Sequence, residues 1–343
     1  MLETIKETTV LPITQPEPAL ADIIRPIRRE LTQVQRSLNQ RLGSRAALLR
    51  EVMDYLFSGQ GKYLRPALAL LSARVARKHR PQVAVQVGVA VELIHTATLI
   101  HDDIIDAAVL RRNRPSINAK WGNEVSVLSG DFLYARAFRI LAELTDTFFL
   151  QTMARTAEEM SRGELAEVEH RCNWRLTEAE YLDIIRGKTA ALMSTSCALG
   201  AYVAAAPRQL VQTLATYGRQ LGMAFQIADD CLDLVGDERV LGKTTGSDLT
   251  RGNLSLPLVY LREQLTPQEY ADTFGSLELS REDAVEKLQR LSRWAGERGA
   301  IERAYDKALA FARQAKATLA QLNGCPVRGP LLQLADYAVR RTH

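Results

Sequence analysis

The chain has 343 residues, of which 46% are hydrophobic, 24% are charged and 6% are aromatic. This is an ordinary globular composition, and it excludes wholesale disorder, a collagen-like repeat and a disulfide scaffold. Lys and Arg number 44 and Asp and Glu number 40, so the formal net charge is +4. That charge is too small to argue for a nucleic-acid partner, and we expect none.

The N-terminal residues 1–22 are predicted to be a loose tail, because TQPEPA carries two prolines that a continuous helix excludes. The start MLETIKETT has mixed charge and no apolar segment, so we expect no signal peptide. From residue 23 to residue 343 the helical period dominates and alternating strand patterns are scarce. Loops are expected at 111–116, 236–257 and 323–330.

Several helices are marked by their ends or by their apolar faces. Thr177 to Glu180 forms a capping box, and Thr266 precedes a proline at the first helical position. An apolar stripe runs from Ile301 to Leu322. The uncharged run 189–207 is rich in Ala, Ser and Thr, which predicts a tightly packed buried helix. We therefore predict an all-α fold, a large single-domain helical bundle over 23–343 around a central cavity.

The four cysteines indicate a reducing environment. Cys172, Cys197, Cys231 and Cys325 form no C-x-x-C pair, which argues against zinc-finger and thioredoxin-like proteins. Unclustered cysteines in a chain of this length suit the cytoplasm. We therefore expect a cytoplasmic protein.

Two acidic motifs interrupt apolar helical runs, LIHDDIID and FQIADDCLD. Their carboxylates are Asp102, Asp103 and Asp106 in the first motif and Asp229, Asp230 and Asp233 in the second. The first and last carboxylate of each motif are four residues apart, so they share a helix face, about 6 Å apart at Cβ. Like charges on an apolar wall bind protons unless a cation neutralises them, and Mg²⁺ prefers such oxygen ligands. We predict that Asp102, Asp106, Asp229 and Asp233 bind metal; a solvated acidic patch is the alternative.

Basic and polar side chains accompany these motifs. Each would be an ordinary surface group by itself, but together they lie beside the acidic motifs or beside glycines. Arginine binds phosphate with two N–H groups and lysine supplies a point charge. The pattern predicts a substrate with two or more phosphates, bound by Lys62, Arg65, His95, Arg111, Arg112, Lys188, Thr189, Gln226 and Lys243.

These motifs, with GKYLRP, GDFLYAR, IIRGKTAAL and LGKTTG, resemble the trans-prenyl diphosphate synthase family, the polyprenyl synthetases, from about residue 23 onward. The resemblance implies the isoprenoid synthase fold. It also implies an enzyme that joins isopentenyl diphosphate head-to-tail to an allylic diphosphate, with about three Mg²⁺ ions per site. The catalytic residues that it implies are Asp102, Asp103, Asp106, Lys188, Asp229, Asp230 and Lys243.

The resemblance also assigns the substrates and the assembly. It places the allylic diphosphate on Arg111, Lys188, Thr189, Gln226 and Lys243. It places isopentenyl diphosphate on Lys62, Arg65, His95 and Arg112. It further implies a homodimer, with a heteromeric partner as the alternative, and transient membrane association for the hydrophobic product.

Four positions depart from the common family pattern. Ala107 and Ala108 follow the first motif where acidic residues are frequent, Asn253 replaces a lysine of short-chain relatives, and Glu167 replaces a glutamine. None of these changes removes a motif aspartate. We therefore expect an active enzyme.

The residues before Asp102 predict the length of the product. Short-chain relatives often carry Tyr or Phe five residues before the first aspartate, but this chain has Ala97, followed by Thr98. Small side chains leave a tunnel open, with its floor at deeper residues such as Ile94 and Phe132. We expect a polyprenyl diphosphate of about 7–10 units, used for quinone side chains.

Other functions fit the sequence less well. A geranylgeranyl or farnesyl product remains the alternative within the family. A terpene cyclase typically carries a different second motif, a non-catalytic partner has no use for clustered buried charge, and a di-iron bundle needs Glu-x-x-His pairs. The two D-D-x-x-D motifs favour chain elongation over all three.

Overall fold

The structure is a computed structural model, and it describes residues 19–41, 46–59, 61–76, 78, 80–111, 113–235, 251–274 and 281–340. The predicted ligands Arg112 and Lys243 lie outside the described residues. Most of the predicted tail and most of the predicted loop 236–257 also lie outside them.

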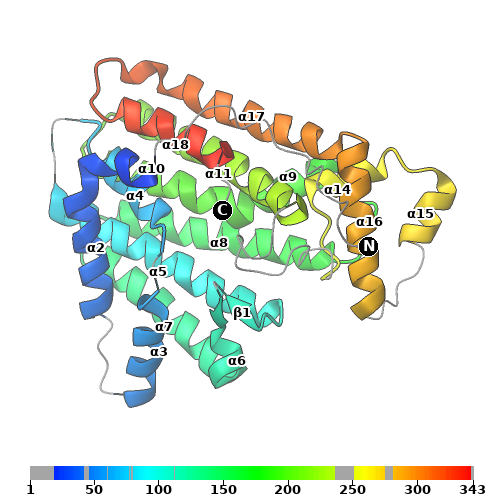
Figure 1. Cartoon of the computed structure of the whole chain (residues 1–343). Helices are drawn as coiled ribbons and strands as arrows, with labels where there is room; N and C mark the ends of the chain where they lie inside the picture. The colour runs from blue at the N-terminus through cyan, green and yellow to red at the C-terminus, as the bar shows by residue number, and fades with distance from the viewer. Residues whose placement is uncertain are drawn as a thin grey trace.

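The described chain is almost entirely helical, which confirms the all-α prediction (Figure 1). The first half contains α1 (Leu20–Ile23), the 3-10 helix η1 (Arg25–Ile27), α2 (Arg28–Arg41), α3 (Ala47–Phe57), α4 (Leu64–Ser72), α5 (Pro81–Ile105), α6 (Ile117–Trp121), α7 (Asn123–Ala142) and α8 (Thr147–Glu169). The second half contains α9 (Glu178–Ile185), the π-helix η2 (Arg186–Ala190), α10 (Ala191–Val203), α11 (Arg208–Val235), α14 (Leu256–Arg262), α15 (Pro267–Phe274), α16 (Arg281–Glu297), α17 (Ala300–Thr318), the 3-10 helix η3 (Leu319–Leu322) and α18 (Arg328–Arg340).

Some boundaries differ from those predicted. The loop 111–116 contains most of a small antiparallel hairpin, in which β1 (Leu110–Arg111) pairs with β2 (Arg114–Pro115). Strands of two residues are too short to show an alternating pattern, which explains why the sequence did not reveal them. α18 begins inside the predicted loop 323–330, and α1 begins inside the predicted tail 1–22.

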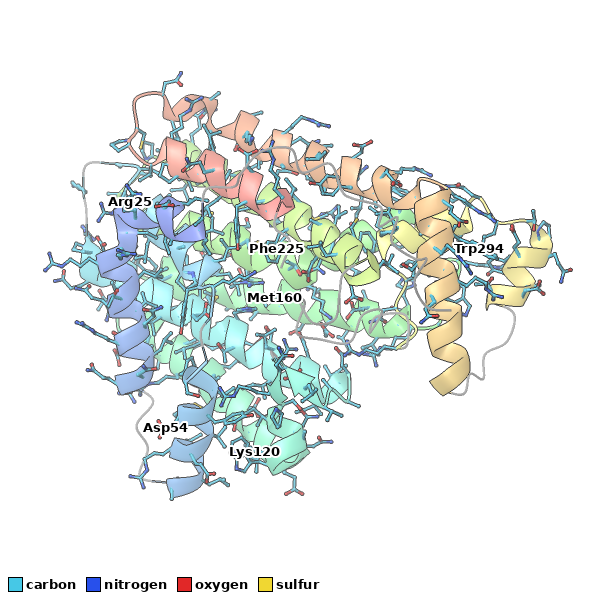
Figure 2. The ribbon with its side chains drawn as sticks, viewed as in Figure 1. Arg25, Asp54, Lys120, Met160, Phe225 and Trp294 are labelled. Carbon is cyan, nitrogen blue, oxygen red and sulfur yellow. The ribbon has the colours of Figure 1, made fainter. Side chains whose placement is uncertain are left out.

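The centre of the bundle is formed by α5, α10 and α11. α5 packs against α7, α10 packs against α4 and α11, and α11 packs against α17, which runs along the upper edge in Figure 1. α10 is buried at almost every position, as the run 189–207 predicts. Met160 of α8 and Phe225 of α11 are labelled in the middle of the bundle (Figure 2).

α5 is long and apolar enough to cross a membrane by length and composition alone. Two thirds of its most apolar window is buried inside the bundle, however. The buried apolar residues of α5 belong to the same cluster as those of its neighbours α4, α7 and α10. α5 is therefore the core helix of the fold. Its C-terminal end carries the first acidic motif out of the core and into the site.

The predicted local signals are present. Thr177 and Glu180 form a reciprocal capping box at the start of α9. The same pair of bonds joins Thr266 and Glu269 at the start of α15. All eight residues of the apolar stripe along α17 and η3 are buried: Ile301, Ala304, Tyr305, Ala308, Ala312, Ala315, Leu319 and Leu322.

Close packing of α10 on α4 requires a glycine at position 200. A Cβ on Gly200 would lie 2.2 Å from the carbonyl oxygen of Ala69. We expect Gly200→Ala to lower the free energy of unfolding by about 1–3 kcal/mol, because backbone must move to relieve the contact. Urea unfolding measures this, with Gly329→Ala as the control, because nothing lies within 4 Å of a Cβ there. Equal stability of the two variants would contradict the packing argument.

Candidate active site

A cavity of about 220 Å³ lies where α5, α8, α9, η2 and α11 meet. Both acidic motifs and several predicted phosphate ligands reach it. Its charged and polar lining consists of Asp102, Asp106, Arg111, Glu167, His170, Tyr181, Lys188, Gln226, Asp229, Asp230, Asn253 and Ser255. We call it the acidic cavity.

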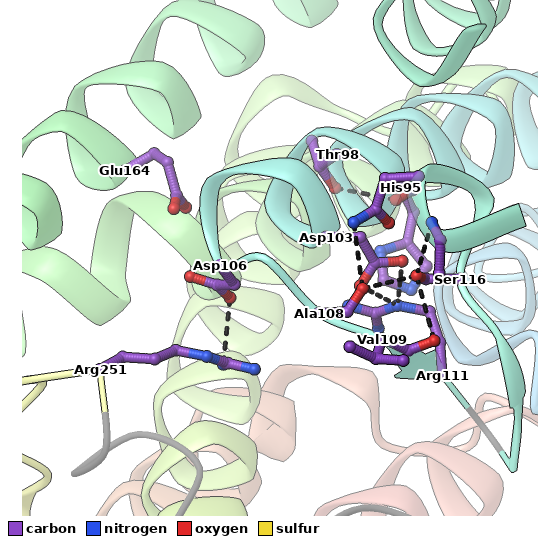
Figure 3. A network of polar contacts seen from close by, with 12 residues as sticks. His95, Thr98, Asp103, Asp106, Ala108, Val109, Arg111, Ser116, Glu164 and Arg251 are labelled. Carbon is purple, nitrogen blue, oxygen red and sulfur yellow. Dashed lines mark hydrogen bonds and ion pairs between the residues drawn. The ribbon is translucent and has the colours of Figure 1, made fainter. Parts of the chain in front are cut away.

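The first acidic motif occupies the last turn of α5. Asp102 lies in this turn and Asp106 is the residue that caps it. The C-terminal end of a helix carries partial negative charge, so carboxylates there need cations. Asp106 forms ion pairs with Arg171, at 2.9 Å, and with Arg251, at 3.1 Å. Figure 3 shows the bond from Arg251.

Asp103 points elsewhere, although it belongs to the same motif. Asp103 is 3% exposed, and both oxygens of its carboxylate accept from Nε of Arg111 at 2.8 Å. In Figure 3 this pair lies beside β1 and apart from Asp106. Asp103 therefore fixes the side chain of Arg111, and it lines a neighbouring cavity rather than the acidic cavity.

The second motif ends α11. Asp229 and Asp230 line the acidic cavity, whereas Asp233 is 3% exposed and is not among the described residues of its lining. Asp230 accepts from the hydroxyl of Tyr181 at 2.5 Å and from Nε2 of Gln226 at 2.8 Å. These bonds orient the wall of the cavity that carries Asp229.

The π-helix η2 brings Lys188 and Thr189 into the site. It packs so closely on α8 that a Cβ on Gly163 would lie 2.6 Å from the backbone nitrogen of Lys188. The hydroxyl of Thr189 donates to Oε1 of Gln226 at 2.7 Å. The predicted contacts Thr189 and Gln226 therefore hold each other in place across η2 and α11.

Lys188 is surrounded by carboxylates. Its Nζ lies 3.0 Å from Glu164 and is also bonded to Glu167, the residue that departs from the common glutamine. Burial lowers the pKa of Lys188, but Glu167, Asp102 and Glu164 raise it, and the net result is a pKa well above the ordinary value. Lys188 therefore stays protonated at any working pH.

Asp102 is the most perturbed carboxylate of the site. Burial raises the pKa of Asp102 to about 7, and the attraction of Lys188 and Arg111 offsets only part of this effect. The same surroundings raise the pKa of Tyr134 to about 12, first by burial and then by the charge of Asp102. A strongly perturbed carboxylate in a cavity is typical of a functional site.

A second cavity, of about 270 Å³, lies beside the first and shares Arg111 with it. It is lined by α3, the N-terminal end of α4, α5 and the β-hairpin. His95 reaches it and accepts from Arg65 at 3.0 Å, while Lys62 is exposed on the segment just before α4. Of the predicted isopentenyl diphosphate ligands that the structure describes, His95 lines this cavity and Arg65 is bonded to His95. Lys62 lies between Gly61 and Tyr63, which also line it.

The predicted chain-length residues lie inside the bundle. Ala97 and Ile94 of α5 are 0% exposed. Thr98 is half-buried and donates to the carbonyl oxygen of His95 at 2.8 Å. Phe132 belongs to α7, which packs against α5, and it is half-buried against the same apolar cluster.

Sequence reasoning missed several charged residues of the site, namely Glu164, His170, Arg171 and Arg251. A signal existed for Glu164, because it lies three residues before Glu167 on the same helix, and that is helical spacing. Arg171 lies beyond the end of α8, where helical spacing does not apply. For Arg251 the sequence carries no comparable signal, since it approaches Asp106 from 145 residues away.

The donor set fits a divalent ion that also binds substrate. Among the described residues, no three His, Cys, Asp or Glu side chains are grouped closely enough to form a metal cage by themselves. Instead, Asp102 and Asp106 come from α5, and Asp229 comes from α11. Mg²⁺ usually takes one or two carboxylates and completes its shell with water and phosphate oxygens.

Comparison with known proteins agrees with this geometry. The polyprenyl synthetase family matches residues 46–293. The chain is 38% identical over 330 residues to heptaprenyl diphosphate synthase component 2 of Geobacillus stearothermophilus, covering 92% of this chain and 96% of that protein. It is 32% identical over 330 residues to a geranylgeranyl diphosphate synthase of Methanosarcina mazei, covering 94% and 99%.

A solved structure is similar over almost the whole chain. It is a polyprenyl synthase from Caulobacter crescentus CB15, complexed with calcium and isoprenyl diphosphate, with a TM-score of 0.90 and 33% identity. The match covers 96% of this chain and all of that one. The chain belongs to the polyprenyl synthetase family, whose members are metal-dependent. It is a trans-prenyl diphosphate synthase, a prenyltransferase of the isoprenoid synthase fold.

The raised pKa of Asp102 predicts a pH-dependent effect on stability. The folded pKa of about 7 lies above the unfolded value of 3.8, so stability falls as the pH rises between these values. We therefore expect Asp102→Asn to raise the Tm of the metal-free protein at pH 8 by about 2–4 °C, and by much less at pH 5. Thermal melts in a chelator measure this, with the exposed Asp306→Asn as the control. A lower Tm for Asp102→Asn at pH 8 would contradict the assignment.

Proposed function

We propose that this enzyme elongates an allylic diphosphate with isopentenyl units to an all-trans polyprenyl diphosphate of about 7–10 units, for quinone side chains. The observation that carries the proposal is the pair of adjoining cavities. One holds carboxylates from both acidic motifs, the other holds His95 beside Arg65, and Arg111 lines both. Two phosphorylated substrates can therefore lie side by side with one arginine between them.

The acidic cavity is the proposed place of the allylic diphosphate. Asp102, Asp106 and Asp229 would hold Mg²⁺, about three ions, and the bound metal supplies positive charge where the diphosphate leaves. Asp233, predicted as a further ligand, is buried at the end of the same helix. Its role as a metal ligand remains a prediction, and so do the roles of Lys243 and Arg112 in binding diphosphate.

The chain's own residues then perform distinct tasks. Lys188 stays protonated and faces the diphosphate together with Arg111, whose side chain Asp103 holds in place. Thr189 and Gln226 fix each other and present the remaining amide hydrogen of Gln226 to phosphate. The geometry thus stabilises negative charge as it develops on the leaving group.

The second substrate is placed for attack from the neighbouring cavity. Arg65 and His95, with Lys62 at its edge, would bind the diphosphate of the isopentenyl group. Its double bond attacks the allylic carbon after the carbon–oxygen bond has broken, and the departing diphosphate takes the proton that is lost. The apolar walls of the bundle exclude the water that would quench the cation.

The length of the product is inferred from the interior of α5. Ala97 and Thr98 are small side chains on α5, which packs against α7, and the growing tail would pass them and reach Ile94 and Phe132. The heptaprenyl synthase component among the relatives supports a long product. The geranylgeranyl diphosphate synthase supports the shorter alternative.

We also propose a homodimer in the cytoplasm. Large apolar side chains are exposed on two neighbouring helices, Val127 and Leu128 on α7 and Leu165 and Val168 on α8. Burying them against a second copy would remove this apolar surface from water. Because one relative is a "component 2", a heteromeric partner is the alternative. Release of the long hydrophobic product would bring the enzyme into transient contact with a membrane.

Loss of a motif aspartate should stop turnover. We expect Asp102→Asn and Asp229→Asn each to lower kcat by at least about a thousandfold, because each removes a metal ligand that acts on the leaving group. Incubation with Mg²⁺, labelled isopentenyl diphosphate and a set of allylic primers measures this, with Asp306→Asn as the control for a lost exposed carboxylate. Activity within about tenfold of the wild type would refute the metal assignment.

A large ring at position 97 should shorten the product. Ala97→Tyr places an aromatic side chain where the tail must pass, and overpacking costs of about 1–3 kcal/mol are enough to move the stopping point. We expect products of about 3–4 units with a near-normal first condensation. Mass analysis of the products measures their chain length, and Ala317→Tyr on the exposed face of α17 is the control. An unchanged long product would mean that the tail leaves along another helix.

A further inference from the structure

Asp106 is held by two arginines from distant parts of the chain. Arg171, which follows α8, donates from Nη2 to Oδ1 at 2.9 Å and from Nη1 to the carbonyl oxygen of Ile105 at 3.4 Å. Arg251, which precedes α14, donates from Nη1 to Oδ2 at 3.1 Å. Both oxygens of the carboxylate therefore accept a guanidinium N–H, one from each arginine.

These ion pairs are stronger than ordinary surface pairs. The side chain of Asp106 is 11% exposed, and those of Arg171 and Arg251 are 27% and 28% exposed. Water screens such pairs only in part. Asp106 also caps the negative end of α5, where a neighbouring positive charge is favourable. Without metal, the two arginines stabilise the negative charge of Asp106 at this end of the helix.

The segments that carry the two arginines are also joined to each other. The backbone N–H of Cys172 donates to the carbonyl oxygen of Gly252 at 2.9 Å. Gly252 has a φ of +82°, and a Cβ there would lie 2.6 Å from Sγ of Cys172. Arg171 and Arg251 are therefore the immediate neighbours of a tight backbone contact, and they reach Asp106 as one unit.

A divalent ion needs the same carboxylate oxygens. On the basis of the proposed function, in which Asp106 ligates metal, we propose that Arg171 and Arg251 are positioning residues that compete with metal for Asp106 and turn to the diphosphate when metal takes the carboxylate. Guanidinium forks bind diphosphate oxygens well, so the arginines exchange one anion for another. Metal and diphosphate then bind more tightly together than either does alone.

The test is the affinity for metal without substrate. We expect Arg171→Gln and Arg251→Gln each to bind Mn²⁺ about threefold more tightly than the wild type, and the double variant about tenfold more tightly. Free Mn²⁺ is counted by electron paramagnetic resonance in a titration of the full-length protein. Arg175→Gln is the matched control, because it removes an exposed positive charge from the same segment. Its Mn²⁺ affinity should match that of the wild type.

A second titration includes inorganic diphosphate. The gain in Mn²⁺ affinity that diphosphate produces should be several-fold smaller in the arginine variants than in the wild type. Circular dichroism checks that each variant is folded. If the double variant does not fold, the test rests on the two single variants. Variants that bind Mn²⁺ alone no more tightly than Arg175→Gln would overturn the competition.

The role of Asp106 as a metal ligand and the competition by the arginines can be tested separately. If Asp106→Asn abolishes Mn²⁺ binding but the arginine variants behave like the control, the metal assignment stands and the competition is wrong. If Asp106→Asn binds Mn²⁺ and diphosphate as the wild type does, Asp106 is not a metal ligand, and both the assignment and the competition are wrong.

Discussion

Carboxylates that line an apolar helical bundle must be neutralised, and the arrangement of this site follows from that requirement. Asp106 is paired with two arginines, Asp103 with Arg111, and the two glutamates of α8 with Lys188. Asp102 responds instead by binding a proton near neutral pH, since burial raises its pKa to about 7. The metal-free site therefore pairs or protonates all three carboxylates of the first motif without an external cation.

On the proposed function, these ion pairs would hold the cations ready for substrate. An arginine or lysine that already rests on a carboxylate is close to the place where a diphosphate will bind, and little order has to be created on binding. Positive metal charge can take over the carboxylates while the diphosphate takes over the cations. On the proposed function, the same set of charges would serve both the empty site and the loaded one.

Much of this could be predicted from the sequence. The helical period, the capping box at Thr177 and the stripe along α17 are local signals, and each follows from the spacing of a few residues. Both acidic motifs are also local, because four residues return a side chain to the same helix face. Asp103 shows the limit of that argument: its neighbour lines the acidic cavity, but the helical turn aims Asp103 itself at Arg111.

The rest depended on contacts that are distant along the chain. Arg251 meets Asp106 only after α5, the end of α8 and the segment before α14 have packed together, and no short-range pattern records this. The hairpin of β1 and β2 was missed because two-residue strands have no period. The division of the site into two cavities that share Arg111 likewise arises from the packing of α3, α5 and α11 rather than from any motif.

The position of the bound metal is the most direct test of the proposed site. Crystals grown with Mn²⁺ and inorganic diphosphate allow anomalous diffraction to locate each ion without reference to the chain. We predict anomalous peaks at ligand distance from Asp102 and Asp106 on one wall and from Asp229 on the other, with diphosphate oxygens completing their shells. Peaks remote from both acidic motifs, with Asp106 still held by Arg171 and Arg251, would contradict this prediction.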